Sequence, residues 1–325
     1  MRKVGNAFVS ELGFGAAAIG NLFSPVSEET AAAAVDAAWE AGIRYYDTAP
    51  HYGLGLSERR IGAALATRPR ATFAVSTKAG RLLEPISPVR GDDLSNGFAV
   101  PAAFRRVWDF SADGVRRSIE ESLLRLGMDR IDIVYLHDPD DYAVPALEEA
   151  YPALERLRAE GVVAAIGVGM NRTGLLTRFV RDTDVDVVMP AGRYTLLDHS
   201  ALGDLLPAAS ERGVSVVVGG VFNSGLLADP QPDATYDYAP VPEEILARAL
   251  RMKDVCARHG VPLRAAALRF PFGHPAVASV LIGARSAAEV HDAATLLRRP
   301  IPGSLWSDLR TAGSLSASVP VPDGD

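Results

Sequence analysis

The sequence predicts a closed (β/α)8 barrel, in which eight parallel strands are surrounded by helices. Two observations lead to this fold class. Helical segments alternate with short apolar segments along most of the chain, and alternation of this kind is typical of parallel sheets. Several of the transitions pass through a glycine, which ends a helix at low cost in the left-handed conformation. The glycines are Gly42, Gly127, Gly161, Gly213 and Gly260.

The strand candidates are short runs rich in β-branched residues, the pattern of strands buried on both faces. In chain order they are Leu12–Gly15, Arg44–Asp47, Phe73–Lys78, Ile131–His137, Val163–Val168, Val185–Met189, Val214–Val218 and Val277–Ile282. A hairpin through Val4–Val9 is expected before the first of them. A doubly wound sheet is the alternative, but no Gly-x-Gly-x-x-Gly turn follows the first strand, which favours closure.

The helices carry their own signals. Ser27 is expected to cap a helix whose first turn holds Glu28 and Glu29, which suit the positive end of the helix dipole. Ser111 opens another helix with one apolar stripe. The segment VPLRAAALRF after Gly260 predicts a helix, so that transition links two helices.

Two proline-rich segments interrupt the alternation, at residues 79–110 and 222–242. Loops of this length in compact domains are usually functional covers or disordered. We therefore expect one barrel domain with long βα loops over residues 1–314, followed by a flexible tail over residues 315–325.

Composition narrows the possible partners of the chain. The 325 residues carry a net charge of −7, which argues against binding to nucleic acids or anionic membranes. The single cysteine, Cys256, excludes an intrachain disulfide and a multi-cysteine metal site. No run approaches the roughly 18 apolar residues of a membrane span, and no signal peptide is recognisable. A cytoplasmic protein that acts on a small molecule is expected.

Polar residues end three of the strand candidates: Asp47, Lys78 and His137. Tyr52 follows Asp47 in the loop TAPHYGLGLSE. Each residue alone has a structural explanation, as a helix cap, a solvent-exposed cation or a packing residue. Their joint placement favours an active site, because reactive groups of a parallel barrel lie at the carboxyl ends of its strands.

These segments resemble a known family. DTAPHYGLGLSERRIG is similar to the aldo-keto reductase signature, and STK and LHDPD match the segments that follow the third and fourth strands. The resemblance extends from ELGFGAAAIG to IGARSAAEV. It implies a nicotinamide-dependent, metal-free oxidoreductase in which Tyr52 exchanges a proton, supported by Lys78, Asp47 and His137.

The physical chemistry of these side chains agrees with those roles. A phenol with a pKa of about 10 is a poor base near neutrality, and an ammonium at Lys78 would lower that pKa. Asp47 can hold the ammonium in place, and His137 can bond the substrate oxygen. His51 and Trp108 are expected to contact the substrate as well, and Phe110 to stack on it. The alternative for Trp108 is a packing anchor of the cover.

The resemblance also suggests a cofactor site. NADPH-dependent members carry Lys and Arg where this chain has Gly283 and Glu289, and a carboxylate would repel a 2′-phosphate but accept a hydrogen bond from a ribose 2′-hydroxyl. NAD is therefore expected, with NADP as the weaker alternative because Arg285 is nearby. The expected cofactor residues are Gly15, Asp47, Asn171, Phe222, Asn223, Ser224, Leu226, Gly283, Arg285, Ser286 and Glu289.

Three phrases depart from the common family pattern: GVGMN, AGRYTLLD and GVFNSG. They resemble the branch of D-threo-aldose (L-fucose) 1-dehydrogenases, which implies NAD-dependent oxidation of the anomeric hydroxyl of an aldose to a lactone. Pyridoxal 4-dehydrogenase and a general NADPH-dependent aldehyde or ketone reductase are alternatives. A redox-sensing binding subunit is the non-enzymatic one, because one barrel serves many functions.

Overall fold

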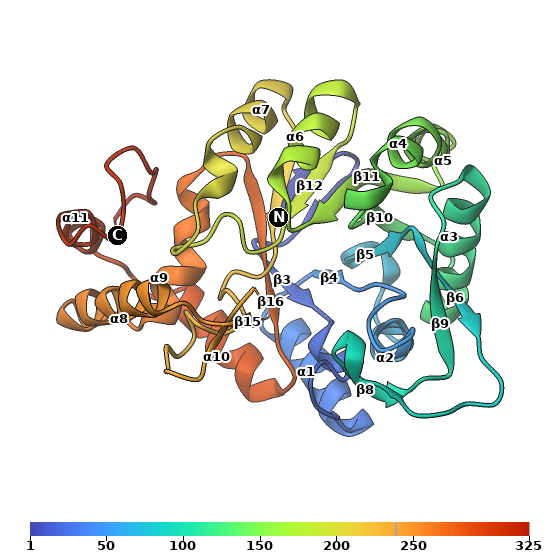
Figure 1. Ribbon diagram of the computed structural model, residues 1–325, viewed down its shortest axis with the longest axis horizontal. Coiled ribbons are helices and arrows are strands. Elements are labelled where there is room, and N and C mark those ends of the chain that lie inside the picture. Colours follow the sequence, from blue (N-terminus) through green and yellow to red (C-terminus); the bar gives the residue numbers. More distant parts are fainter. Residues whose placement is uncertain (238, 325) are drawn as a thin grey trace.

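The computed structural model describes residues 1–237 and 239–324 and contains a closed barrel of parallel strands (Figure 1). Each strand pairs in parallel with the next around the ring, and β16 closes it against β3. The prediction of a closed (β/α)8 barrel is confirmed. In order around the ring the strands are β3 (Leu12–Gly15), β4 (Tyr45–Asp47), β5 (Ala74–Ala79), β10 (Ile131–His137), β11 (Val163–Met170), β12 (Val187–Pro190), β13 (Ser215–Val218) and β16 (Val277–Gly283).

Helices surround the barrel (Figure 1). Ser27 and Ser111 cap α1 and α3 as predicted, since their hydroxyls accept bonds from the N–H groups of Thr30 and Gly114. The five transition glycines take positive φ angles of 61° to 87°. The helices are α1 (Glu28–Glu40), α2 (Leu56–Leu65), α3 (Ala112–Leu126), α4 (Ala143–Pro145), α5 (Tyr151–Ala159), α6 (Thr173–Asp182), α7 (Leu205–Arg212), α8 (Glu243–Arg258), α9 (Leu263–Arg269), α10 (Ala287–Leu297) and α11 (Gly303–Thr311).

A hairpin closes the amino end of the barrel. Strands β1 (Arg2–Val4) and β2 (Ala7–Val9) pair antiparallel, as predicted. Val4 and Val9 are fully buried against the interior side chains of the barrel. The hairpin therefore covers the amino end of the barrel.

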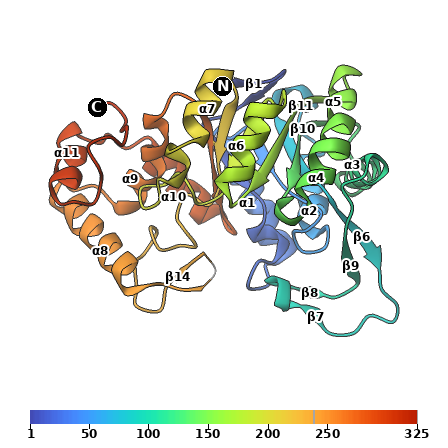
Figure 2. The same cartoon turned by 45° about the horizontal axis from the view of Figure 1, so that its top comes forward.

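The segment 79–110, for which the sequence left open a cover or disorder, is ordered. Strand β6 (Arg81–Pro85) pairs with β9 (Phe104–Trp108), and β7 (Asp92–Asp93) pairs with β8 (Phe98–Pro101). Figure 2 shows both hairpins extending from one side of the barrel. We call residues 79–110 the cover. In the second long segment, β14 (Thr235–Tyr236) pairs with β15 (Ala239–Pro240), while Tyr238 lies outside the described residues.

The end of the chain packs against the barrel, where composition suggested a flexible tail. Leu315 and Val319 are each 3% exposed and belong to the main hydrophobic core. Arg310 donates a hydrogen bond to the Val319 carbonyl oxygen at 2.9 Å. These two side chains are packed in the core, and the mobility of the tail stays a prediction. Within the part of the chain that the structure describes, no helix is long and apolar enough to cross a membrane.

Candidate active site

The four polar residues singled out in the sequence come together at the carboxyl end of the barrel. Asp47, Lys78 and His137 lie on the adjacent strands β4, β5 and β10. The Lys78 Nζ is 2.7 Å from Asp47 Oδ2 and 4.6 Å from the centre of the Tyr52 ring. The Tyr52 and His137 rings lie 6.0 Å apart, centre to centre. The expected constellation therefore exists as a spatial cluster.

Lys78 is held as an ammonium in a buried position. The Lys78 side chain is 2% exposed and also donates to the Thr48 carbonyl oxygen at 2.9 Å. Burial alone would lower the pKa of Lys78, but the neighbouring Asp47 and Tyr52 outweigh it and raise that pKa above its usual value. A fixed positive charge thus lies beside the phenol.

A chain of buried hydroxyls supports Asp47 from the barrel interior. Ser76 donates to Asp47 Oδ1 at 2.6 Å, and its hydroxyl lies 3.0 Å from the Tyr45 hydroxyl. Tyr45 in turn lies 3.0 Å from the Tyr135 hydroxyl. Because Ser76 has one proton and uses it on Asp47, Tyr45 must donate to Ser76. Both carboxylate oxygens of Asp47 are therefore occupied, one by this chain and one by Lys78.

The pKa of Tyr52 differs from the expectation drawn from the sequence. Enclosure in the protein raises this pKa, the Lys78 charge lowers it, and the net shift is upward. The expectation that Lys78 brings the pKa of the phenol below its ordinary value is therefore wrong. Desolvation of the phenolate raises the pKa of Tyr52 by more than the Lys78 charge lowers it. The Asp47 charge raises this pKa further and so partly offsets the effect of Lys78.

Two neutral histidines border Tyr52. Burial, together with the charges of Arg81 and Lys78, holds the pKa of His137 well below its usual value. Enclosure and the charges of Arg81, Arg106 and Lys78 lower the pKa of His51 to about 2. Both imidazoles are therefore uncharged at neutral pH, and they lie 5.8 Å apart, centre to centre.

A cavity of about 840 Å³ opens over this cluster. Tyr52, Lys78 and His137 line it together with His51, Trp108 and Asn171. Their contact with a substrate or cofactor stays a prediction. Its other walls include small or apolar side chains at the ends of β11 and β12. These are Gly169, Met170, Met189 and Ala191.

Trp108 both packs and lines the cavity. Its ring lies 5.3 Å from the Tyr142 ring and 4.3 Å from the Arg81 guanidinium, yet 38% of the residue is exposed. Trp108 can therefore serve both as a packing anchor of the cover and as a substrate contact. Phe110 is 3% exposed and is absent from the cavity wall, so the expectation that it stacks on a substrate is wrong.

The comparisons with known proteins agree with this geometry. Residues 11–312 match the family model described as the aldo/keto reductase family. The chain belongs to this family. It is 51% identical over 310 residues to a D-threo-aldose 1-dehydrogenase from a Pseudomonas species, with 94% of each chain covered.

Two further relatives place the chain within the family. It is 39% identical over 327 residues to a pyridoxal 4-dehydrogenase from Microbacterium luteolum, with 95% of each chain covered. The holo form of an aldo-keto reductase from Bacillus halodurans superposes with a TM-score of 0.73 at 27% identity, covering 96% of this chain and 95% of that one. Aldo/keto reductases use a nicotinamide cofactor, so we ask whether the cavity of this chain can hold one.

The walls of the cavity suit a nicotinamide ring. Met189, Ala191 and Gly169 offer a largely apolar surface beside Lys78 and Tyr52, and Asn171 supplies an amide that can bond a carboxamide. Gly15 pairs with both Gly283 and Asp47 in the barrel, so these predicted residues lie side by side at the strand ends.

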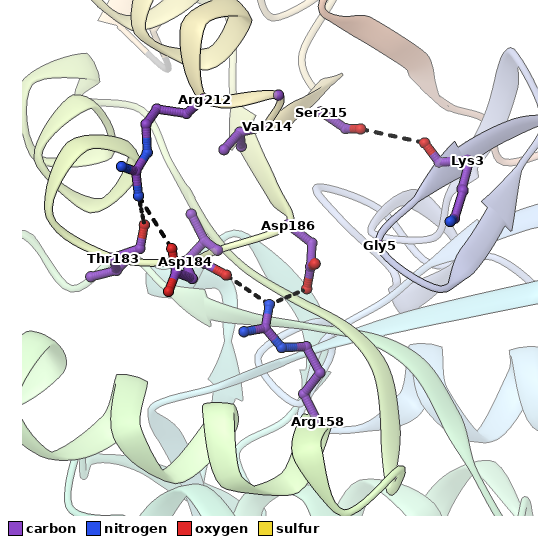
Figure 3. A pocket seen from close by; sticks show the side chains of 11 residues that line it. Lys3, Gly5, Arg158, Thr183, Asp184, Asp186, Arg212, Val214 and Ser215 are labelled. Carbon is purple, nitrogen blue, oxygen red and sulfur yellow. Dashed lines mark hydrogen bonds and ion pairs between the residues drawn. The ribbon is translucent and has the colours of Figure 1, made fainter.

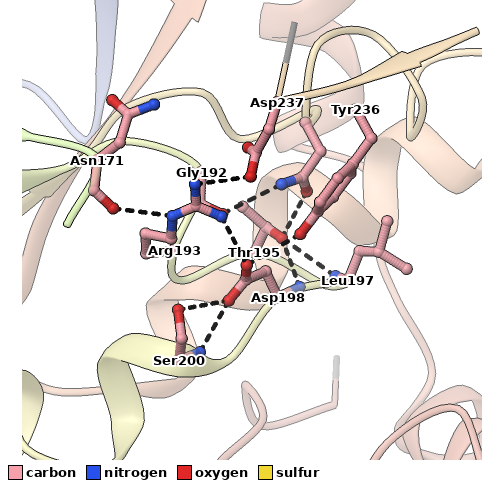
Figure 4. Close-up of polar contacts among 10 residues, drawn as sticks. Asn171, Gly192, Arg193, Thr195, Leu197, Asp198, Ser200, Tyr236 and Asp237 are labelled. Carbon is pink, nitrogen blue, oxygen red and sulfur yellow. Dashed lines mark hydrogen bonds and ion pairs between the residues drawn. The ribbon is translucent and has the colours of Figure 1, made fainter. Parts of the chain in front are cut away.

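An arginine ties the loops around Asn171 together (Figure 4). Arg193 donates to the Asn171 carbonyl oxygen at 2.8 Å and pairs with Asp198 and Asp237. The Asn223 side chain donates to the Gly192 carbonyl oxygen and accepts from Thr195. That amide is therefore engaged within the protein.

Three more predicted cofactor residues differ in their surroundings. The Leu226 side chain is fully buried in the main core, so it cannot touch a ligand there. Phe222 is half-buried at the edge of that core, and Ser224 is exposed. The contact of Asn223 and Leu226 with a cofactor stays a prediction.

The segment 283–289, predicted to contact the ribose of the cofactor, also makes hydrogen bonds within the protein. Ser286 caps α10 by accepting from the Glu289 N–H at 3.3 Å, and the Glu289 carboxylate accepts from the Arg285 N–H at 2.9 Å. The Arg285 guanidinium bonds the Ser24 hydroxyl and the Leu22 carbonyl oxygen. Their contact with a cofactor stays a prediction.

Sequence reasoning missed three charged residues near the site. Arg81 pairs with Asp138, which directly follows His137 and has a φ of 44°. Arg106 bonds His51 from the cover. The position of Asp138 next to His137 was a usable signal, but no local pattern marks Arg81 or Arg106, because both act across long sequence separations.

A second cavity, near the amino ends of the strands, holds charged side chains of both signs (Figure 3). Arg158 pairs with Asp186 at 2.9 Å, and Arg212 pairs with Asp184 at 3.2 Å. These pairs tie α5 and α7 to the loop between α6 and β12, so we interpret the cluster as stabilising. Among the described residues, no group of His, Cys, Asp or Glu side chains could hold a metal ion.

Proposed function

We propose that this protein is an NAD-dependent dehydrogenase that oxidises the anomeric hydroxyl of an aldose to a lactone. The observation that carries the proposal is the Lys78 ammonium, which bonds Asp47 and lies against the Tyr52 ring at the base of the cavity. The 51% identity to a relative named D-threo-aldose 1-dehydrogenase supports the choice of substrate class.

In the proposed reaction Tyr52 removes the proton of the anomeric hydroxyl. The Lys78 ammonium stabilises the phenolate that acts as base, and Asp47 keeps that ammonium in position. Neutral His137 bonds the substrate oxygen from the other side of the cavity. A bound nicotinamide cofactor would supply the acceptor for the hydride on the anomeric carbon. Loss of one proton from oxygen and one hydride from carbon turns the hemiacetal into a lactone carbonyl.

The choice of NAD over NADP depends on Glu289. Its side chain is exposed at the start of α10, where a carboxylate would accept a bond from a ribose 2′-hydroxyl and repel a 2′-phosphate. Arg285 is engaged with Ser24 and Leu22, which supports NAD further.

A substrate panel tests the proposal. Purified protein is mixed with NAD⁺ or NADP⁺ and with L-fucose, D-arabinose or pyridoxal, and reduction of the cofactor is followed by absorbance. We expect the highest kcat/KM with NAD⁺ and an aldose. No turnover of either aldose, or turnover with NADP⁺ alone, would overturn the proposal.

Pyridoxal is the second candidate substrate. The relative named pyridoxal 4-dehydrogenase is 39% identical over 95% of this chain. Pyridoxal forms an internal hemiacetal, so the same proton and hydride losses would yield a lactone. Trp108 lines the cavity and is 38% exposed, so either a sugar or a pyridine could contact it.

A further inference from the structure

His51 is held from the cover by an arginine. The Nε of Arg106 on β9 donates to His51 Nδ1, and its Nη2 donates to the His51 carbonyl oxygen at 3.0 Å. His51 directly precedes Tyr52 in the chain and lines the same cavity. One guanidinium thus contacts both the ring and the backbone of this residue.

Arg106 is itself fixed by a carboxylate. Its Nη1 and Nη2 bond the two oxygens of Asp93 at 2.8 Å and 2.5 Å, and these side chains are 11% and 5% exposed. Asn96 donates to Asp93 Oδ1 at 2.8 Å. A two-pronged arginine–carboxylate pair fixes the plane of the guanidinium. The direction of the bond to His51 is therefore set by both hairpins of the cover.

This contact determines where His51 carries its proton. A guanidinium has only donors, so the Nδ1 that it bonds must be without a proton. A neutral imidazole then carries its one proton on Nε2. Because the pKa of His51 is lowered to about 2, the ring stays neutral throughout the range in which enzymes work.

We propose that Arg106 is a positioning residue that locks His51 in the Nε2–H form, so that this imidazole donates a hydrogen bond to a substrate oxygen next to the reacting carbon. The inference rests on the proposed function and narrows it to substrates with an acceptor oxygen at that place. The ring oxygen or the neighbouring hydroxyl of an aldose meets this requirement. The cover thereby takes part in substrate selection through Asp93 and Arg106.

The proton position can be measured without any substrate. Protein labelled with ¹⁵N-histidine has six pairs of ring nitrogen signals, and the His51→Gln variant identifies the pair that belongs to His51. We expect a protonated Nε2 and an unprotonated Nδ1 between pH 6 and 8 in the unsubstituted protein. In Arg106→Met we expect both forms. A protonated Nδ1 in the unsubstituted protein overturns the inference whether or not aldoses are substrates.

Kinetics with the preferred aldose provide the second test. Arg106→Met is expected to raise KM about tenfold, the effect of one lost hydrogen bond, with a smaller change in kcat. Arg105→Met is the matched control, because Arg105 lies on the same strand and pairs with Glu84 at the exposed side. Equal KM values in the two variants would contradict the inference.

Two substitutions of His51 keep the test valid if Arg106→Met disturbs the cover. The amide of His51→Gln can accept from Arg106 and donate to the substrate, so its KM should stay within about threefold of the original. His51→Leu can do neither and should show the full loss. Similar KM values for His51→Gln and His51→Leu would show that no donated bond is made.

Discussion

The pKa of Tyr52 results from two opposing influences at the residue scale. Enclosure in the protein raises it, and the Lys78 ammonium lowers it without cancelling the rise. In the oxidative direction the base is the phenolate, which is therefore a minor species near neutrality. The fixed charge of Lys78 makes that species accessible, since the pKa of Lys78 is raised and its charge persists.

The rate of aldose oxidation should therefore rise with pH. Below the pKa of Tyr52 the phenolate fraction grows tenfold per pH unit, so log kcat/KM should climb from pH 6 to 9 with a slope approaching one. His51 and His137 stay neutral over this range and add no acid limb. A pH–rate profile checks this, and a falling rate between pH 7 and 9 in folded protein would contradict it.

Replacing Tyr52 by Phe removes the proposed acid–base group and keeps the ring. We expect kcat to fall by about 10² to 10⁴, the usual contribution of general acid–base catalysis. Cofactor binding should persist, because the cavity wall at Asn171, Met189 and Ala191 is unchanged. Cofactor fluorescence titration is the control, and near-normal turnover would exclude Tyr52 as the acid–base group and favour a binding role.

At the scale of elements, the family signature combines reactive and structural residues. In SERRIG, Ser57 bonds the Ala16 carbonyl oxygen, and Glu58 is fully buried. A Cβ on Gly62 would lie 2.0 Å from the Leu126 carbonyl oxygen, so only glycine lets α2 approach α3. Half of the signature thus places α2 against its neighbours, while Asp47 and Tyr52 provide the chemistry.

Glu58 joins three elements and gives a stability prediction. Its carboxylate accepts from Arg125 on α3 at 2.5 Å and from Thr77 on β5 at 2.7 Å. Arg125→Met should lower the free energy of unfolding by roughly 3–5 kcal/mol, because a buried carboxylate loses its cation. Arg117→Met on the same helix removes an exposed pair and should change it by less than about 0.5 kcal/mol. Urea unfolding compares the two variants.

On the scale of the whole molecule, the end of the chain contributes to the core. Removing residues 315–325 exposes the sites of Leu315 and Val319, each worth about 1.5–3 kcal/mol when buried. We expect the truncated protein to lose about 3 kcal/mol of unfolding free energy, measured by urea titration. A chain that ends at residue 322 keeps both side chains and serves as the control. An unchanged midpoint for the shorter chain would support a mobile tail.

The sequence by itself determined the barrel and the cluster of Asp47, Tyr52, Lys78 and His137. Both follow from local patterns: periodicity and glycines mark the strands, and in any parallel barrel the residues that end adjacent strands meet at one mouth. Closure does not depend on which distant side chains touch, so no tertiary detail was needed.

Only the tertiary structure showed which long-range contacts surround the active site at the carboxyl end of the barrel. The contact of Arg106 with His51, the pairing of Arg81 with Asp138 and the packing of Leu315 join residues far apart in the chain. The upward shift of the pKa of Tyr52 depends on how much protein surrounds the phenol. Burial and long-range contacts are properties of the folded chain as a whole, and a linear pattern of residue types carries no record of them.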